Sequence, residues 1–165
     1  MGIKTPITSE KKLSYEGTFD IVTTYSFLKT YLEDFKHYDI TEKELDEKNK
    51  DGKKDIKGYY TAELEFNDYY KLHMTFELNM SGKNIVVENQ QGVYNLVEGS
   101  ANLVINTYVE QDFMGKRSKG PLSEFLDKVY SKYVTDEKKE AIIKLSIDTS
   151  EFLSKFKQTL NYNAK

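Results

Sequence analysis

Residues 70–80 alternate strictly between apolar and polar side chains, and this alternation constrains the fold more than any other feature of the chain. Successive side chains of a β-strand point to opposite faces of the sheet, so the pattern predicts a strand with one covered and one wet face. A sheet of this kind needs a second layer over its apolar face. The apolar positions are Tyr70, Leu72, Met74, Phe76, Leu78 and Met80.

Strand patterns and turn residues recur on both sides of this segment. Residues 38–48 are compatible with helix or strand, because their charges favour a helix and their place before Asp51-Gly52 favours a strand that enters a hairpin. We interpret them as a strand. Turns are predicted at 67–68, 81–83, 90–92 and 98–100. The six or seven predicted strands are 12–18, 38–48, 54–66, 70–80, 84–88, 93–97 and 101–112.

Apolar residues spaced by three and four predict helices near both ends of the chain. Asp20 is a suitable N-cap for a first helix over 20–37, whose apolar face would be Ile21, Tyr25, Leu28, Leu32 and Phe35. A second helix is predicted from Pro121 to about residue 134. Thr135 then caps a long helix over 136–161, which we expect to be unbroken, although 148–151 offer an alternative break. The stripe of this long helix is Ile142, Leu145, Thr149, Phe152, Phe156 and Leu160.

Composition narrows the class of protein. The chain has 165 residues without an obvious linker, which predicts one domain, and we expect residues 1–9 to be loosely ordered. No apolar run is long enough to cross a membrane, and the start lacks the apolar core of a signal peptide. The sequence also contains no cysteine. Together these features lead us to expect a cytoplasmic location. A net charge of −3 with Arg117 as the only arginine argues against nucleic acid as a partner. The oligomeric state cannot be predicted.

The order of elements, with a run of strands before a long C-terminal helix, resembles the helix-grip fold of the START-like superfamily. The chain is similar to small single-domain prokaryotic proteins of that group at 17–20 (Gly-Thr-Phe-Asp), 38–43, 68–71, 111–113 and 125–133. The resemblance implies an α+β fold in which a curved antiparallel sheet of six or seven strands wraps around the C-terminal helix and encloses a cavity. The family commonly places two short helices between its first two strands, whereas 20–37 is long enough for one.

Catalytic and metal-binding motifs are missing from the sequence. There is no G-x-S-x-G nucleophile elbow, and no P-loop accompanies the Gly-Lys pairs. His37 and His73 lack the spacing of metal ligands and are expected at the surface. Acidic side chains on the wet strand faces are expected to be solvated, and the basic loop 116–119 would be solvated or meet an anionic head group. The solvated acidic residues are Glu63, Glu65 and Glu77. We therefore predict no cofactor and no metal.

The 13 tyrosines and 9 phenylalanines could line a pocket between sheet and helix or fill that space. The leading hypothesis is a non-enzymatic module that binds a hydrophobic or lipid-like small molecule. One alternative is a cyclase- or hydratase-like enzyme that uses pocket tyrosines and a carboxylate such as Asp112. Another is an interaction protein with a solid core. The predicted pocket residues are Tyr60, Leu64, Tyr70, Met74, Phe76, Leu103, Ile105, Thr107, Phe152 and Phe156.

Overall fold

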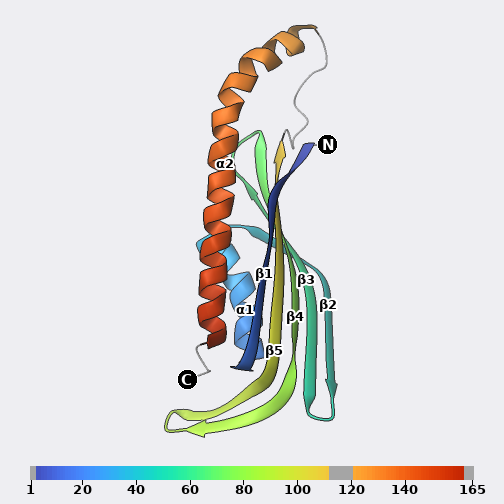
Figure 1. The fold of residues 1–165 in the computed structure, drawn as a ribbon, viewed down its shortest axis with the longest axis vertical. Coiled ribbons are helices and arrows are strands. Elements are labelled where there is room, and N and C mark those ends of the chain that lie inside the picture. Colours follow the sequence, from blue (N-terminus) through green and yellow to red (C-terminus); the bar gives the residue numbers. More distant parts are fainter. Residues whose placement is uncertain (1–2, 112–120, 162–165) are drawn as a thin grey trace.

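The computed structural model describes the backbone of residues 3–111 and 121–161, and the side chains of 10–88, 90–111 and 136–160. The chain starts with a strand, a helix and a single π-helical turn, continues through four strands and ends in a long helix (Figure 1). The elements are β1 (Ile3–Phe19), α1 (Ile21–Thr30), η1 (Tyr31–Phe35), β2 (Asp39–Lys50), β3 (Lys53–Glu65), β4 (Tyr70–Asn89), β5 (Gly92–Gln111) and α2 (Pro121–Asn161).

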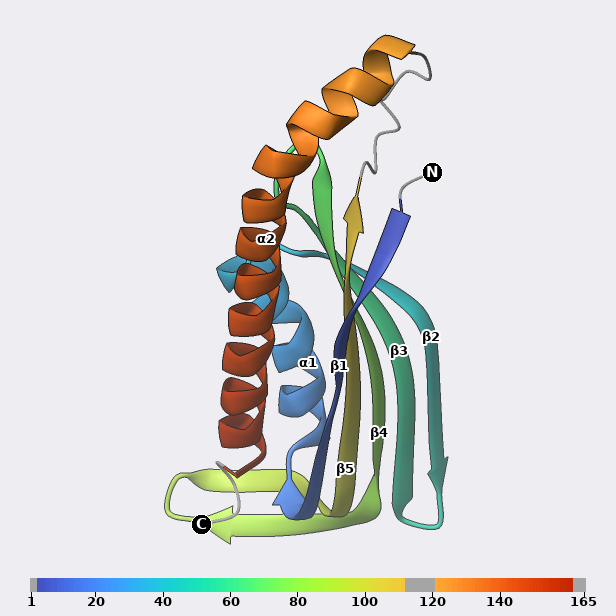
Figure 2. The same cartoon turned by 45° about the horizontal axis from the view of Figure 1, so that its top comes forward.

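The described strands form one antiparallel sheet in the order β1-β5-β4-β3-β2. The sheet curves, and both α1 and α2 lie over the same face of it (Figure 2). The α+β class is therefore confirmed. The strand from residue 70 is central, as its alternation predicts, and Leu72, Phe76 and Leu78 are fully buried. This helix-covered side is called the inner face below.

The described sheet has five strands rather than the predicted six or seven. The turns predicted at 81–83 and 98–100 are wrong, because β4 and β5 run through both segments as one long hairpin. Gly82 is paired with Gly99, and a Cβ on Gly99 would lie only 2.0 Å from the carbonyl oxygen of Ser81. These glycines permit a close approach of two backbones where the hairpin bends, and they do not end the strands.

β1 is longer than expected, because residues 3–9 continue the strand that the sequence places at 12–18. Its pairing with β5 runs from Ile3 opposite Gln111 to Phe19 opposite Val97, with a register shift at 7–9. The long β5 offers a backbone partner over this whole length, so β1 forms the edge of the sheet from Ile3 to Phe19.

The segment at 39–50 is a strand, and the hairpin that follows it turns at Asp51 and Gly52, which both have positive φ. Glycine takes this conformation without steric cost, and aspartate tolerates it better than most residues. β2 pairs with β3 along its length, and its side chains are almost all exposed. The hairpin prediction is confirmed, and β2 forms the outer edge of the sheet.

Asp20 caps α1 as predicted. Its Oδ1 accepts hydrogen bonds from the backbone amides of Val22 at 3.0 Å and Thr23 at 3.3 Å. Of the predicted apolar face, Ile21, Leu28 and Leu32 are buried and Tyr25 is partly buried.

The last residue of that predicted face, Phe35, is 71% exposed, whereas Tyr31 is 9% exposed. Residues 31–35 form a π-helical turn, which holds more residues per turn than an α-helix. The wider turn rotates the buried face, so the α-helical spacing places Phe35 wrongly.

α2 is one continuous helix of 41 residues. The break predicted near 134–136, with Thr135 as a cap, is therefore wrong, whereas the unbroken helix over 136–161 is confirmed. Leu145, Thr149, Phe152, Phe156 and Leu160 are buried, and Ile142 is partly buried, as its stripe predicts. The side chains of 122–133 and the basic loop 116–119 lie outside the described part of the structure.

Candidate functional site

An aromatic cluster occupies the space between the central strand and α2. The ring centroids of Phe76 and Phe152 are 5.2 Å apart, and those of Phe152 and Phe156 are 5.6 Å apart. Phe27 of α1 stacks against Phe152 at 6.0 Å and against Tyr31 at 5.2 Å. Phe76, Phe152 and Phe156, which the sequence places in a pocket wall, therefore contact one another, and this part of the interior is packed.

Phe27 and Tyr31 were missed by sequence reasoning, because the ideal stripe of α1 excludes both positions. The aromatic content of the segment was the available signal. The other predicted pocket residues lie on the inner face of the sheet, where the register pairs Tyr60 with Phe76 and Met74 with Thr107. Leu64 is partly buried. The buried members of this set are Tyr60, Tyr70, Met74, Leu103, Ile105 and Thr107.

The hydroxyl of Tyr60 is the buried polar atom that stands out on the inner face. The residue is 4% exposed, and its oxygen makes no hydrogen bond of good geometry within the described part of the chain, although the nearby Tyr25 hydroxyl acts on it as a weak acceptor. The ring leans over Gly58, since a Cβ on that glycine would lie 2.7 Å from the Tyr60 oxygen. Burial raises the pKa of the Tyr60 hydroxyl, so it stays protonated at neutral pH and can both donate and accept a hydrogen bond.

Tyr25 of α1 lies beside this hydroxyl but directs its own proton elsewhere. The two rings have centroids 6.0 Å apart, and the Tyr25 hydroxyl donates to Oε2 of Glu42 at 2.9 Å. Burial is also the main cause of the raised pKa of Tyr25. The pair therefore places a buried hydroxyl without a well-formed hydrogen bond next to a more exposed one, at the boundary between α1 and the β2–β3 side of the sheet.

A second polar cluster, which the sequence did not reveal, joins the end of η1 to α2. Asp148 is 3% exposed, and its Oδ2 accepts from the Tyr38 hydroxyl at 2.9 Å and lies 3.1 Å from Nζ of Lys144. Nζ of Lys36 lies 3.6 Å from Oδ1 of the same carboxylate and also pairs with Glu151, a hydrogen bond that raises the pKa of the lysine. Every oxygen of Asp148 has a partner, so the cluster fits a structural role.

His73 lies on the outer face of the sheet, as predicted, but it is 7% exposed rather than at the surface. The Tyr108 ring stacks on it with a centroid separation of 4.4 Å. Its Nε2 lies 2.8 Å from Oε1 of Glu110, and its Nδ1 lies 3.6 Å from Oε1 of Glu63. Stacking and two flanking carboxylates bury this histidine, which alternation alone cannot show.

The partner of Glu63 on this face is Lys71, whose Nζ lies 2.9 Å from Oε2, and this hydrogen bond is the main cause of the lowered pKa of Glu63. Glu65 and Glu77 are exposed, as expected. The carboxylates of Glu63 and Glu110 flank opposite edges of the His73 ring, so they do not converge on one point. Within the described residues no cluster of histidine, cysteine, aspartate and glutamate side chains has the arrangement of a metal site.

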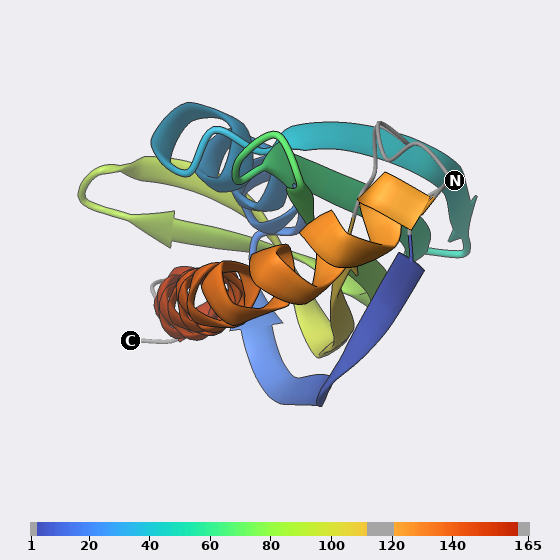
Figure 3. The same ribbon diagram turned by 90° about the horizontal axis from the view of Figure 1, so that it is seen from above.

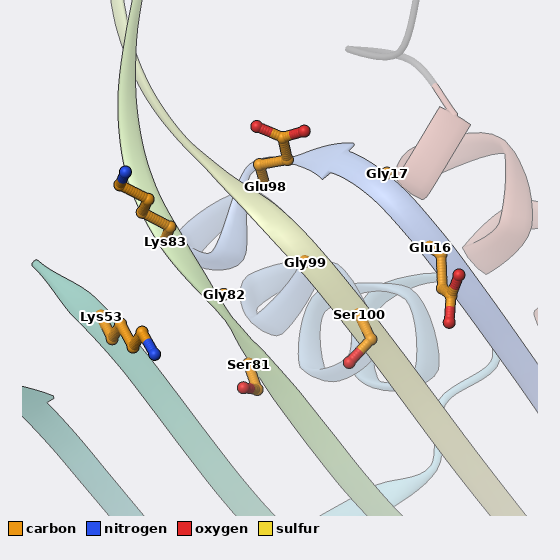
Figure 4. A pocket seen from close by; sticks show the side chains of 9 residues that line it. All are labelled: Glu16, Gly17, Lys53, Ser81, Gly82, Lys83, Glu98, Gly99 and Ser100. Atoms are coloured by element: carbon orange, nitrogen blue, oxygen red, sulfur yellow. The ribbon is translucent and has the colours of Figure 1, made fainter.

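Three of the hollows among the described residues lie on the outer face, away from the predicted pocket. The largest has a volume of about 560 Å³ and lies over the glycines of the hairpin bend (Figure 4). Its rim combines Lys53 and Lys83 with Glu16 and Glu98, so its charges balance. The others, of about 270 and 210 Å³, lie beside β2 and β3. All three are open to solvent and lack a buried polar group aimed into them.

The sequence was compared with models of protein families and with curated proteins, and neither comparison found a match. No helix in the described part of the chain combines the length and the apolar character needed to span a bilayer.

Proposed function

We propose that this protein binds a small hydrophobic molecule on the inner face of the sheet and anchors its single polar group on the hydroxyl of Tyr60. The observation that carries the proposal is a buried hydroxyl that makes no hydrogen bond of good geometry in the described part of the chain and has only the Tyr25 hydroxyl as a nearby acceptor. Such a group costs about 1–3 kcal/mol, and a native structure that keeps one commonly satisfies it with water or a ligand.

The arrangement of the inner face sets the chemistry of the ligand. Phe76, Phe152 and Phe156 fill the centre, so the ligand would lie toward Tyr25, Gly58 and Tyr60 rather than between the central strand and α2. Apolar side chains dominate this face, and unpaired charge is costly to bury. A flat or elongated apolar molecule with one hydroxyl or carbonyl group fits best. The helix-grip arrangement of a curved sheet around a helix is part of this proposal.

A panel of fatty acids, flavonoid-like aromatics and nucleotides, titrated while thermal unfolding is followed, tests the proposal. A ligand at a hundred times its dissociation constant adds about 2.7 kcal/mol to stability. We expect stabilisation by an apolar compound that carries one polar group and none by nucleotides. Stabilisation by nucleotides alone, or by no member of the panel, would overturn the proposal.

The substitution Tyr60→Phe sharpens the test, and Tyr59→Phe is its matched control, because Tyr59 is the neighbouring residue on the outer face and is 39% exposed. Removal of the Tyr60 hydroxyl should weaken the binding of a ligand with a polar group roughly tenfold, and it should leave the affinity for a hydrocarbon analogue unchanged. It should also stabilise the protein without ligand. Equal losses for both ligands would contradict a hydrogen bond from Tyr60.

A second candidate function is a protein–protein interaction module with a solid core. The contacts among Phe27, Phe76, Phe152 and Phe156 favour it, since they fill the space that a larger pocket would need. The cyclase- or hydratase-like alternative requires a carboxylate near the inner tyrosines, and its candidate, Asp112, lies outside the described residues. The buried Asp148 does not serve this role, because Tyr38, Lys36 and Lys144 already pair with it.

A further inference from the structure

Residues 84–97, called the arm below, form a two-stranded hairpin that projects beyond the rest of the sheet (Figures 2 and 3). The pairing of β3 with β4 ends at Lys53 opposite Lys83, and the pairing of β1 with β5 ends at Phe19 opposite Val97. Past these points β4 and β5 pair with each other alone in the described part of the chain. Two-stranded hairpins of this kind are marginally stable by themselves.

Both strands of the arm present an open backbone edge. The amide of Asn84 donates to the carbonyl of Gly52 at 2.8 Å, but the outer edges of 85–89 and 92–96 have no strand partner among the described residues. An open edge carries a row of unpaired N–H and C=O groups, which is a template for a strand from another chain. Such an edge fits an extended segment of chain.

The arm also lacks the protection that the outer edge of the sheet has. β2 contains eight charged residues among its twelve, whereas the arm contains one, Glu88. Charges on an edge strand discourage pairing with other chains. Val86 and Val93 are 65% and 63% exposed, and Tyr94 is 39% exposed. The outer part of the arm thus combines open edges with exposed apolar side chains, whereas Leu96 and Val97 at its base are buried, and an uncharged apolar strand would fit these edges.

We propose that residues 92–96 of the arm pair, antiparallel, with the same residues of a second copy of this chain. This segment is Gly-Val-Tyr-Asn-Leu and carries no charge, so two copies meet without repulsion. The occupant must be extended, uncharged and in need of an edge partner, and the arm itself meets all three conditions. A two-fold contact satisfies the 92–96 edge of both copies at once, and this symmetry is the commonest in homo-oligomers.

The end of β1 defines the register of this contact. Phe19 occupies the outer side of β5 at Val97, so a docked strand stops at residue 96. A two-fold antiparallel pairing over 92–96 is then centred on Tyr94, which faces its own copy, and Val93 faces Asn95. The contact is smaller than the roughly 1,200 Å² typical of stable complexes, so we expect a weak dimer that depends on concentration.

Analytical ultracentrifugation of the full chain over a wide concentration range tests the dimer. Tyr94→Lys places two like charges opposite each other and should weaken the dimer at least about tenfold. Val86→Lys is the matched control, because Val86 is also exposed, at 65%, but lies on β4, one strand away from the contact. It should leave the dissociation constant unchanged. Unchanged unfolding midpoints in both variants would show that folding is intact.

Hydrogen exchange identifies which edge is used. Amides within 92–96 should exchange more slowly as the concentration rises, while those of 85–89 should not change. A monomer at every concentration would overturn the proposal and leave the edge to an extended segment of a different protein. A dimer that is insensitive to Tyr94→Lys, or protection at 85–89 instead, would overturn the assignment to β5. The inference does not depend on the proposed ligand site.

Discussion

The hydroxyl of Tyr38 donates a hydrogen bond of 2.9 Å to Oδ2 of Asp148, a buried carboxylate 110 positions later in the sequence. Tyr38 is 1% exposed and lies directly before β2, whereas Asp148 belongs to α2. The contact therefore ties the C-terminal helix to the point where the chain leaves η1 and enters the sheet. Lys36 and Lys144 balance the carboxylate charge from either side.

We predict that Tyr38→Phe lowers the free energy of unfolding by about 1.5–3 kcal/mol. The variant keeps the ring but removes a hydrogen bond to a charged, buried acceptor. Urea unfolding measures the change, and Tyr59→Phe is the control on an exposed ring. Equal stabilities for the wild type and Tyr38→Phe would show that the two lysines alone satisfy Asp148.

The raised pKa of Tyr38 predicts that the protein loses stability at alkaline pH. Burial, reinforced by the nearby Asp148 carboxylate, raises the pKa of Tyr38, whereas an unfolded tyrosine ionises near about pH 10. The stabilising contribution is therefore complete below about pH 10 and is lost as the pH rises toward the folded-state pKa. Urea unfolding at increasing alkaline pH should show a shallower decline for Tyr38→Phe than for the wild type. Parallel curves would contradict this prediction.

Phe76→Ala should lower the free energy of unfolding by roughly 3–5 kcal/mol, as large truncations in a core do. Phe76 is fully buried on the central strand and packs against Phe152. Glu77→Ala, at the next position on the exposed face, should change stability little. An unchanged denaturant midpoint for Phe76→Ala would show that the core is misplaced.

Gly99→Ala should destabilise the protein by about 1–3 kcal/mol, the usual range for overpacking a close contact. The added Cβ would collide with the backbone at Ser81 and Gly82, and backbone atoms cannot move aside as a flexible side chain can. Ser100→Ala adds no bulk at the neighbouring position and is the control. Thermal unfolding compares the two variants, and a Gly99→Ala midpoint equal to that of the control would contradict the close approach.

Asp20→Ala should lower the free energy of unfolding by about 1 kcal/mol, the usual effect of losing an N-cap. Asp20→Asn retains an oxygen acceptor for the amides of Val22 and Thr23 and should lose much less. Chemical denaturation distinguishes these outcomes. Similar losses in both variants would indicate that the charge of Asp20, rather than its cap geometry, stabilises α1.

The periodicity of the sequence predicted the type of the main elements and most of their buried faces, although it divided β4, β5 and α2 into shorter pieces. The alternation at 70–80 is enough to place Phe76 inward, because side-chain direction in a strand depends on parity alone. The stripe that includes Phe152 and Phe156 likewise predicts the buried side of α2. Asp20 predicts the start of α1, because an N-cap residue bonds only to backbone amides two or three positions later. None of these conclusions needs a distant partner.

Only the tertiary structure showed the features that depend on contacts between segments far apart in the sequence. Gly82 and Gly99 look like turn residues singly, and only their pairing across two strands shows that they bend one hairpin. His73 has an outward position by alternation, yet stacking with Tyr108 buries it. Periodicity likewise cannot predict the hydrogen bond from Tyr38 to Asp148, or that the buried hydroxyl of Tyr60 lacks a well-formed one. Whether a polar atom is satisfied is decided by neighbours that folding brings together, and no local pattern contains that information.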